Sequence, residues 1–226
     1  MAKITIKEIR FNTRVTQKEI PFFRSCLCSM ADFDSNTLMH NHKGDCLRYG
    51  YPLVQYRSIG NKGVVFAINE GLAEVAPLEN ITDMPVDIGS QRRTLKLESS
   101  HMQISDLCFT ATPLLYKIDN WLPFSSDNER LFVKLDSLLD RIAFLQRMLT
   151  ANIISMAKGF GIHLDEEIKV SVKDLFESKR LLYKGVPFIS FSLSFYANLA
   201  LPDKIALGKH VSHGFGVVSV VGNDIS

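Results

Sequence analysis

Histidine, tyrosine and basic residues are concentrated between residues 40 and 62 of this chain. His40 and His42 stand two residues apart, and Tyr49 follows in the same polar stretch. An imidazole exchanges a proton near neutral pH, and a phenol can donate a proton or hydrogen-bond an anion. Cations that can bind phosphate accompany them: Lys43, Arg48, Arg57 and Lys62.

These groups are sufficient to cleave RNA without a metal ion. The substrate's own 2′-hydroxyl can attack the adjacent phosphorus if a base removes its proton, an acid protonates the leaving 5′-oxygen, and cations stabilise the phosphorane. The products would carry a 2′,3′-cyclic phosphate and a 5′-hydroxyl. Two other interpretations stay open. One is a solvated loop without a catalytic role, and the other is a zinc site that combines His40, His42 and Cys46 with Cys26 or Cys28.

A second group of residues with binding chemistry lies between residues 198 and 216. Glycines can bring backbone N–H groups close to a phosphate, and the lysines and histidines add positive character. The same composition is also typical of a long flexible hairpin. The residues expected to bind RNA in this segment are Lys204, Gly208, Lys209, His210, His213, Gly214 and Gly216.

A third group is the basic stretch between residues 91 and 96. If this stretch is a strand, alternation places Arg93 with Leu95 on one face. Arg92 then lies on the opposite face with Lys96. Arg92 and Arg93 could follow an RNA backbone, or the charges could protect an exposed strand edge from pairing with another chain.

Composition and charge limit the class of protein. The chain has 226 residues, of which 46% are hydrophobic and 22% charged, so it can form one large folded domain or two small ones. The net charge is only +2, so any field that attracts RNA must come from local clustering. No apolar run approaches the ~20 residues that span a bilayer, and no signal-peptide core is present. The sequence therefore predicts a cytoplasmic protein with reduced thiols and no membrane partner.

The apolar patterns predict an α+β chain. A capping box at Thr16–Glu19 opens an amphipathic helix, and Gly60–Gly63 is a hairpin turn. Strands are expected at 3–11, 53–57, 64–68, 91–107, 112–118, 168–172, 180–183, 187–197 and 217–221, and helices at 70–78 and 127–158. The strands 91–107 and 112–118 are expected to pair as a long hairpin.

This order of elements favours two tandem ferredoxin-like (RRM-like) domains. Pro85 and Gly89 lie in a polar stretch, which places the boundary there. We expect an N-terminal domain over residues 1–85 with the His-x-His loop. The C-terminal domain, residues 86–226, then carries the glycine-rich loop.

Both ends of the chain resemble one family. The segment His40-Asn41-His42, then Tyr49-Gly50-Tyr51-Pro52-Leu53-Val54-Gln55-Tyr56, then Ala67–Gly71 resembles the N-terminal half of the CRISPR repeat-processing endoribonucleases of archaea and anaerobic bacteria. The stretches Gly185–Phe188, Phe191–Phe195 and Asn198–Gly216 look like the glycine-rich loop region of that branch. The similarity covers both halves of the chain in the right order.

The resemblance implies two ferredoxin-like folds in tandem and cleavage within the repeats of a precursor transcript, which releases guide RNAs. We expect no cofactor and no metal. It makes His42 and Tyr49 the expected catalytic pair and His40 a helper. Ala206 departs from the family's loop, which often has a glycine there. The stretch from residue 26 to 39 lacks the lysine that some members use in catalysis. The candidates for the charge-stabilising residue are then Lys43, Arg48 and Lys62.

Three classes of function stay open from the sequence. The first is a repeat-RNA endoribonuclease, and the second is a catalytically silent RNA-binding subunit of a CRISPR effector complex. The third is a metal-binding protein unrelated to RNA. The expected partners are CRISPR repeat RNA and proteins of an effector complex, and a homodimer is also allowed.

Overall fold

The structure is a computed structural model that describes residues 2–30, 37–40, 42–43, 46–47 and 50–222. The chain divides into two compact units, and each is described by itself. The N-terminal unit contains Lys3–Ser105 together with Ser212–Gly214, and the C-terminal unit contains Asp106–Val211 and the chain from Phe215 onward.

The N-terminal unit is built on a five-stranded sheet in the order β4-β5-β1-β7-β6. Its strands are β1 (Ala2–Arg14), β4 (Val54–Ile59), β5 (Lys62–Ile68), β6 (Asp83–Ile88) and β7 (Gln91–Leu107). Without the edge strand β6, this is the ferredoxin-like order, in which the first and third strands are central. The predicted β4–β5 hairpin is confirmed, with Asn61 in the left-handed conformation at its turn.

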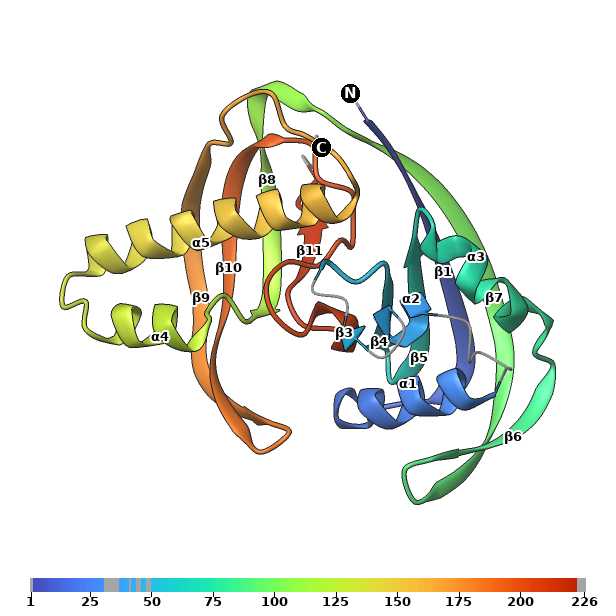
Figure 1. The fold of residues 1–226 in the computed structure, drawn as a ribbon. Helices are drawn as coiled ribbons and strands as arrows, with labels where there is room; N and C mark the ends of the chain where they lie inside the picture. Colours follow the sequence, from blue (N-terminus) through green and yellow to red (C-terminus); the bar gives the residue numbers. More distant parts are fainter. Residues whose placement is uncertain (1, 31–36, 41, 44–45, 48–49, 223–226) are drawn as a thin grey trace. The chain divides into compact units, whose positions relative to one another are not determined.

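Two helices cover one face of this sheet (Figure 1). They are α1 (Ile20–Ser29) and α3 (Gly71–Val75), which continues as a 3-10 turn over Ala76–Asn80. The predicted capping box precedes α1, because the backbone N–H and the hydroxyl of Thr16 both donate to the Glu19 carboxylate at 2.8 Å. A single core contains Ile20, Phe23 and Leu27 of α1, Val75 of α3, and Ile9, Phe11, Val54 and Tyr56 of the sheet.

The C-terminal unit repeats the same topology. Its sheet has the order β11-β8-β10-β9, formed by β8 (Phe109–Trp121), β9 (Val170–Tyr183), β10 (Val186–Leu199) and β11 (Val217–Val220). The connection from β8 to β9 holds α4 (Ser126–Val133) and α5 (Leu138–Gly159), and α5 runs across the sheet (Figure 1). Where a second helix would follow β10, the chain forms the loop 200–216. Among the described helices, none is long and apolar enough to cross a membrane.

The single helix predicted over residues 127–158 is wrong, because the chain folds back between α4 and α5. Backbone N–H groups of Lys134 and Leu135 bond three residues back, which ends α4. The fold-back packs the Phe132 ring against Phe144, with centroids 5.9 Å apart. Both helices present apolar residues to the same unit, so the helical spacing of those residues continues through the break and conceals it.

The predicted hairpin of 91–107 with 112–118 is also wrong, because β7 and β8 belong to different sheets. β7 instead pairs with β6 through a turn at Gly89, whose φ is +63°. Because it contains Pro85, β6 is not predicted as a strand from the sequence, but a proline is tolerated on an edge strand. The polar stretch is therefore a hairpin, and the structure divides at Ser105/Asp106 rather than between residues 85 and 86.

Candidate functional site

The histidine-bearing stretch lies in the N-terminal unit, between α1 and β4. Its described parts are α2 (Thr37–His40), β2 (His42–Lys43) and β3 (Cys46–Leu47). β2 and β3 pair antiparallel, with His42 opposite Leu47. The side chains of His40, His42, Lys43 and Cys46, and the whole of Arg48 and Tyr49, lie outside the described residues. Their expected roles in catalysis, RNA binding or zinc binding stay predictions.

The residue before this stretch is fixed from two sides. Met39 is 1% exposed. Its backbone carbonyl accepts a hydrogen bond from Arg24 Nε on α1 and another from Tyr56 Oη on β4, both at 3.4 Å. Burial raises the pKa of Tyr56 well above its ordinary value, so this phenol stays protonated and can donate. The Cys28 thiol donates to the same carbonyl at 3.8 Å, so three side chains hold the peptide that leads into His40.

The residues after the stretch are fixed in the same unit. Tyr51 is 9% exposed, and its hydroxyl accepts a hydrogen bond of 3.0 Å from Gln55 Nε2. Gln55 is fully buried on β4, next to Tyr56. One strand thus anchors both flanks of the histidine-bearing stretch. The Tyr-x-Tyr-Pro-Leu-x-Gln-Tyr string that carries the family resemblance supplies these anchors.

One predicted histidine from the C-terminal loop lies in the N-terminal unit. His213 is 6% exposed, and its Nε2 lies 3.4 Å from Arg24 Nη1. Its Nδ1 lies 3.3 Å from the Ser212 hydroxyl, and its carbonyl accepts a 2.8 Å hydrogen bond from Gln17 Nε2. Arg24 is not among the residues predicted from the sequence, although it is the only charged residue of α1.

The glycines of the C-terminal loop allow close packing inside the C-terminal unit. Gly208 has φ +95°, and a Cβ there would lie 2.6 Å from the Leu122 carbonyl oxygen. Gly216 has φ +68°, and a Cβ there would collide with the carbonyl of Leu207. Both positions therefore require glycine for conformation and for space.

Several backbone N–H groups of this loop are used within the unit. Leu207 donates to the Gly216 carbonyl and Lys209 to the Leu122 carbonyl, both at 2.8 Å, and Gly216 donates to Asn120 at 3.2 Å. These three N–H groups hold the loop in place. Phosphate binding by Gly208, Gly214 and Gly216 stays a prediction.

His210 packs in an aromatic cluster of the C-terminal unit. Its ring centroid lies 4.9 Å from that of Tyr183 and 5.0 Å from that of Phe188. Burial lowers the pKa of His210, and the charges of Lys209 and Lys184 lower it further. At neutral pH the ring is therefore uncharged, so it suits stacking on a base better than ion pairing with phosphate.

The basic candidates differ in what surrounds them. The Lys62 ammonium pairs with Glu98, and the Arg93 guanidinium pairs with Glu19 and bonds the Arg14 carbonyl. Arg93 lowers the pKa of Glu19 to about 2.

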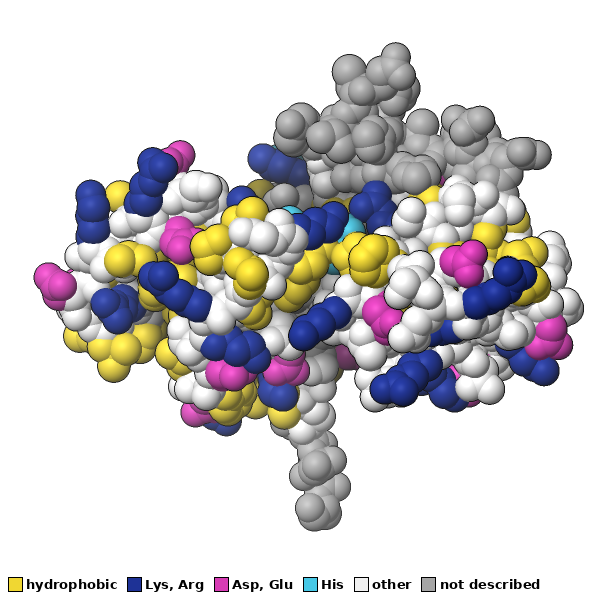
Figure 2. All heavy atoms as spheres, turned by 90° about the horizontal axis from the view of Figure 1, so that it is seen from below, with side chains coloured by type: hydrophobic (Ala, Val, Ile, Leu, Met, Phe, Trp, Pro, Cys, Tyr) yellow, Lys and Arg dark blue, Asp and Glu magenta, His cyan; other side chains and the backbone are white. Residues whose placement is uncertain are grey.

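The predicted faces of β7 are confirmed, since Leu95 is buried and Arg92 is exposed. Lys209 is also exposed, and Lys204 is half-buried. On the face shown in Figure 2, Lys and Arg side chains are interspersed with Asp and Glu.

The two thiols considered for a zinc site are both buried in the N-terminal unit. Burial raises the pKa of Cys26 to about 11 and also raises the pKa of Cys28, so both thiols keep their proton at neutral pH when no metal is bound. Cys28 Sγ lies 3.6 Å from Tyr56 Oη. In the described part of the chain, no group of three His, Cys, Asp or Glu is placed to hold a metal ion.

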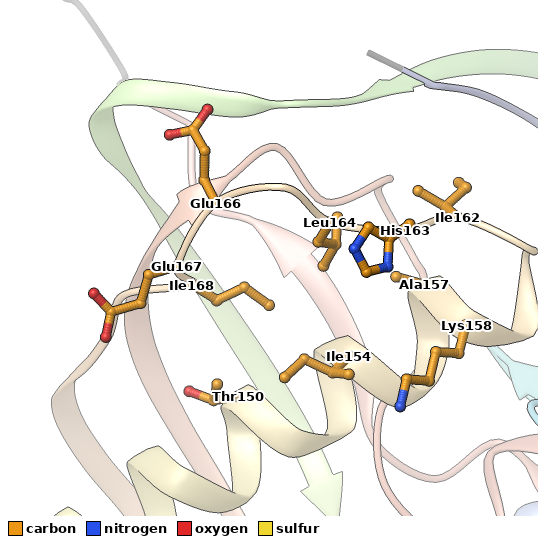
Figure 3. A pocket seen from close by; sticks show the side chains of 10 residues that line it. All are labelled: Thr150, Ile154, Ala157, Lys158, Ile162, His163, Leu164, Glu166, Glu167 and Ile168. Atoms are coloured by element: carbon orange, nitrogen blue, oxygen red, sulfur yellow. The ribbon is translucent and has the colours of Figure 1, made fainter.

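A cavity of about 310 Å³ lies in the C-terminal unit beside α5. Its wall is mostly aliphatic, and His163 and Lys158 contribute polar groups (Figure 3). The carboxylates of Glu166 and Glu167 point away from His163 (Figure 3). Catalytic groups do not converge there as they would in an active site.

Comparison with known proteins covers both units. A model of the Cas6b N-terminal domain matches residues 2–106, and a model of the Cas6b C-terminal domain matches residues 108–221. An uncharacterized protein of Methanocaldococcus jannaschii is 31% identical over 101 residues, which are 45% of this chain and 67% of that protein. The junction between the two family models lies where the structure divides.

Solved structures show the same fold over nearly the whole chain. A crystal structure of Cas6b matches with a TM-score of 0.87 at 23% identity, and it covers 97% of this chain and 100% of its own. A crystal structure of the CRISPR RNA processing endoribonuclease Cas6b has the same coverage, a TM-score of 0.74 and 22% identity. Because both domain models match in order along the two units, this chain belongs to the Cas6b family.

Proposed function

We propose that this chain is a metal-independent endoribonuclease that cleaves CRISPR repeat RNA in precursor transcripts. The guide RNAs would carry 2′,3′-cyclic phosphate and 5′-hydroxyl ends. The observation that carries the proposal is the ordered match of both Cas6b domain models to the two units. One similar structure is described as a CRISPR RNA processing endoribonuclease, which agrees with this function.

The proposed chemistry belongs to the histidine-bearing stretch. His42 acts as the base or the acid, and Tyr49 contacts either the 2′-hydroxyl or the leaving 5′-oxygen. His40 orients or charges the site. Rigid support favours this assignment, because Met39 and Tyr51, which flank the stretch, are buried and hydrogen-bonded.

Charge stabilisation is proposed to come from cations near the same stretch. Lys43 and Arg48 stay candidates from the sequence. Lys62 is a weaker candidate, because its ammonium already pairs with Glu98. CRISPR repeat RNA is the proposed partner, and effector-complex proteins and a homodimer stay expectations from the sequence.

The test is a cleavage assay with synthetic repeat RNA in excess EDTA. We expect cleavage, with a 5′-hydroxyl that accepts a label directly from a polynucleotide kinase. The second product should carry a cyclic phosphate that resists phosphatase until acid opens it. A matched RNA with a 2′-deoxy sugar before the cut should bind and stay intact, because it lacks the nucleophile.

Three outcomes would contradict the proposal. Loss of cleavage in EDTA would mean that a metal takes part. Products with 5′-phosphate ends would mean that water, and not the 2′-hydroxyl, is the nucleophile. Binding without cleavage would indicate a catalytically silent RNA-binding subunit.

A further inference from the structure

Arg24 connects two segments that are far apart in the sequence. Its Nε donates to the Met39 carbonyl at 3.4 Å, and its Nη1 lies 3.4 Å from His213 Nε2. Met39 directly precedes His40, and His213 comes from the loop near the C-terminus. All of these groups lie in the N-terminal unit.

The direction of these hydrogen bonds follows from the chemistry of the groups. A guanidinium only donates, so the His213 Nε2 that faces it must accept. The ring proton is then on Nδ1, which faces the Ser212 hydroxyl at 3.3 Å. Gln17 Nε2 holds the carbonyl of His213 at 2.8 Å. His213 is thus a fixed acceptor that orients the guanidinium.

A guanidinium suits this position because its donors form a rigid planar fork. One arm fixes the peptide carbonyl before His40, and another arm is fixed by His213. A lysine has one ammonium on a flexible stem, so it cannot hold the same two acceptors in a defined geometry. The Tyr56 hydroxyl and, at 3.8 Å, the Cys28 thiol also donate to the Met39 carbonyl.

We propose that Arg24 and His213 form a positioning pair that fixes the peptide before His40 and thereby aligns the histidine-bearing stretch for RNA cleavage. The proposal rests on the proposed function and adds two residues to it. Neither residue is assigned a proton-transfer step. A misplacement of about 1 Å in a catalytic group can lower a rate about 10²-fold, so a positioning residue has a measurable effect.

The first experiment distinguishes a positioning role of Arg24 from a role of its positive charge. Single-turnover cleavage at saturating repeat RNA, and the Kd measured separately, are compared for wild type, Arg24→Lys and Arg24→Gln. Both variants should lose about 10- to 100-fold in rate with little change in Kd. The matched control is Arg10→Gln on β1, because Arg10 also pairs within the N-terminal unit, with Glu8 at 2.8 Å. It should cleave at the wild-type rate.

The second experiment tests whether His213 acts as a hydrogen-bond acceptor or transfers a proton. In His213→Gln the amide oxygen can replace the Nε2 acceptor, so the rate should stay near that of wild type. His213→Phe removes the acceptor and should lose as much rate as Arg24→Gln. The double variant Arg24→Gln/His213→Phe should be no slower than either single variant, because the two residues act as a unit.

Two results in these assays would overturn the inference. If Arg24→Lys kept the wild-type rate while Arg24→Gln lost it, Arg24 would act as a charge on the phosphate. If His213→Gln were as slow as His213→Phe, His213 would carry a proton.

Amide hydrogen exchange of the protein alone tests the pair without any cleavage. Exchange over residues 37–47 should rise about 10-fold in Arg24→Gln and His213→Phe, while Arg10→Gln leaves it unchanged. Unchanged exchange in both variants would overturn the pair. A wild type that fails to cut RNA would instead refute the proposed function, and the exchange result would still decide the pair.

Discussion

The two units share one strand order but carry their added segments at different connections. In the N-terminal unit, the histidine-bearing stretch lies between the first and second strands, β1 and β4, and a short helix follows β5. In the C-terminal unit, a helical hairpin joins β8 to β9, and the glycine-rich loop follows β10. A ferredoxin-like sheet therefore accepts an inserted segment at either crossover without a change in strand order.

The two inserted segments are also held in different ways. Buried side chains anchor both flanks of the histidine-bearing stretch, through the Met39 carbonyl and the Tyr51 hydroxyl. Within the C-terminal unit, the glycine-rich loop is held by its backbone N–H groups and by Gly208 and Gly216, which leave no space for a Cβ. We therefore expect mutations in the first segment to affect the rate of cleavage, and mutations of these two glycines to affect stability.

The largest expected effect concerns His42. His42→Ala should lower the single-turnover rate about 10²–10⁴-fold, the usual size of a general acid–base contribution, and leave RNA affinity nearly unchanged. His40→Ala should cost less, because His40 is assigned a supporting role. The measurement is the rate at saturating RNA together with the Kd. If the double variant His40→Ala/His42→Ala cleaved at the wild-type rate, the chemistry would lie elsewhere, with His210 and His213 the next histidines to test.

Gly216 in the glycine-rich loop and Gly50 beside the histidine-bearing stretch test how the two segments are held. Gly216→Ala should lower the free energy of unfolding by about 2–4 kcal/mol, because it adds backbone strain and a collision with the Leu207 carbonyl. Gly50→Ala, beside the histidine-bearing stretch, is the matched control, since a Cβ there meets nothing within 4 Å. Denaturant unfolding measures both. Equal stability of the two variants would contradict the account of the loop.

RNA binding should depend on the exposed cations more than on the paired ones. Arg92→Ala and Lys209→Ala should each weaken the slope of log K against log[salt] by about 0.7, the value for one phosphate contact with a single strand. Lys62→Ala and Arg93→Ala should change the slope less, because their charges already have carboxylate partners. Filter binding over a range of salt concentrations gives the slopes. The reverse ranking would show that the paired cations contact RNA.

The smallest expected effect is the acid stability of the N-terminal unit. Glu19 has a folded pKa of about 2, below its ordinary value of 4.5, because Arg93 bonds its carboxylate. The ionised carboxylate therefore stabilises the fold above about pH 4.5, and this contribution is lost as the pH falls toward 2. Arg93→Gln should flatten the fall in unfolding free energy between pH 5 and pH 3. The same pH dependence in both proteins would remove Glu19 as its source.

Local sequence patterns predicted much of the fold. The capping box, the β4–β5 hairpin and the buried Leu95 follow from short-range rules, and the structure confirms them. The resemblance to CRISPR repeat-processing endoribonucleases is confirmed by the family models. The strand β6 was missed because Pro85 argues against a central strand but not against an edge.

Long-range contacts could not be predicted in the same way. Arg24 and His213 are 189 positions apart, and no periodicity links them. The fold-back between α4 and α5 was missed because apolar spacing reports which face is buried but not where the chain reverses direction. The sequence feature that points to Arg24 is its position as the single charged residue of an otherwise uncharged helix.

The most direct test of the central claim is the single-turnover rate of Tyr49→Phe, measured beside wild type in excess EDTA. The substitution keeps the aromatic ring and removes only the hydroxyl, so stability should change by no more than about 1 kcal/mol. We predict that wild type cleaves repeat RNA at full rate in EDTA and that Tyr49→Phe is much slower with an unchanged Kd. A wild-type rate for Tyr49→Phe would remove Tyr49 from the mechanism, and an inactive wild type in EDTA would contradict metal-independent cleavage.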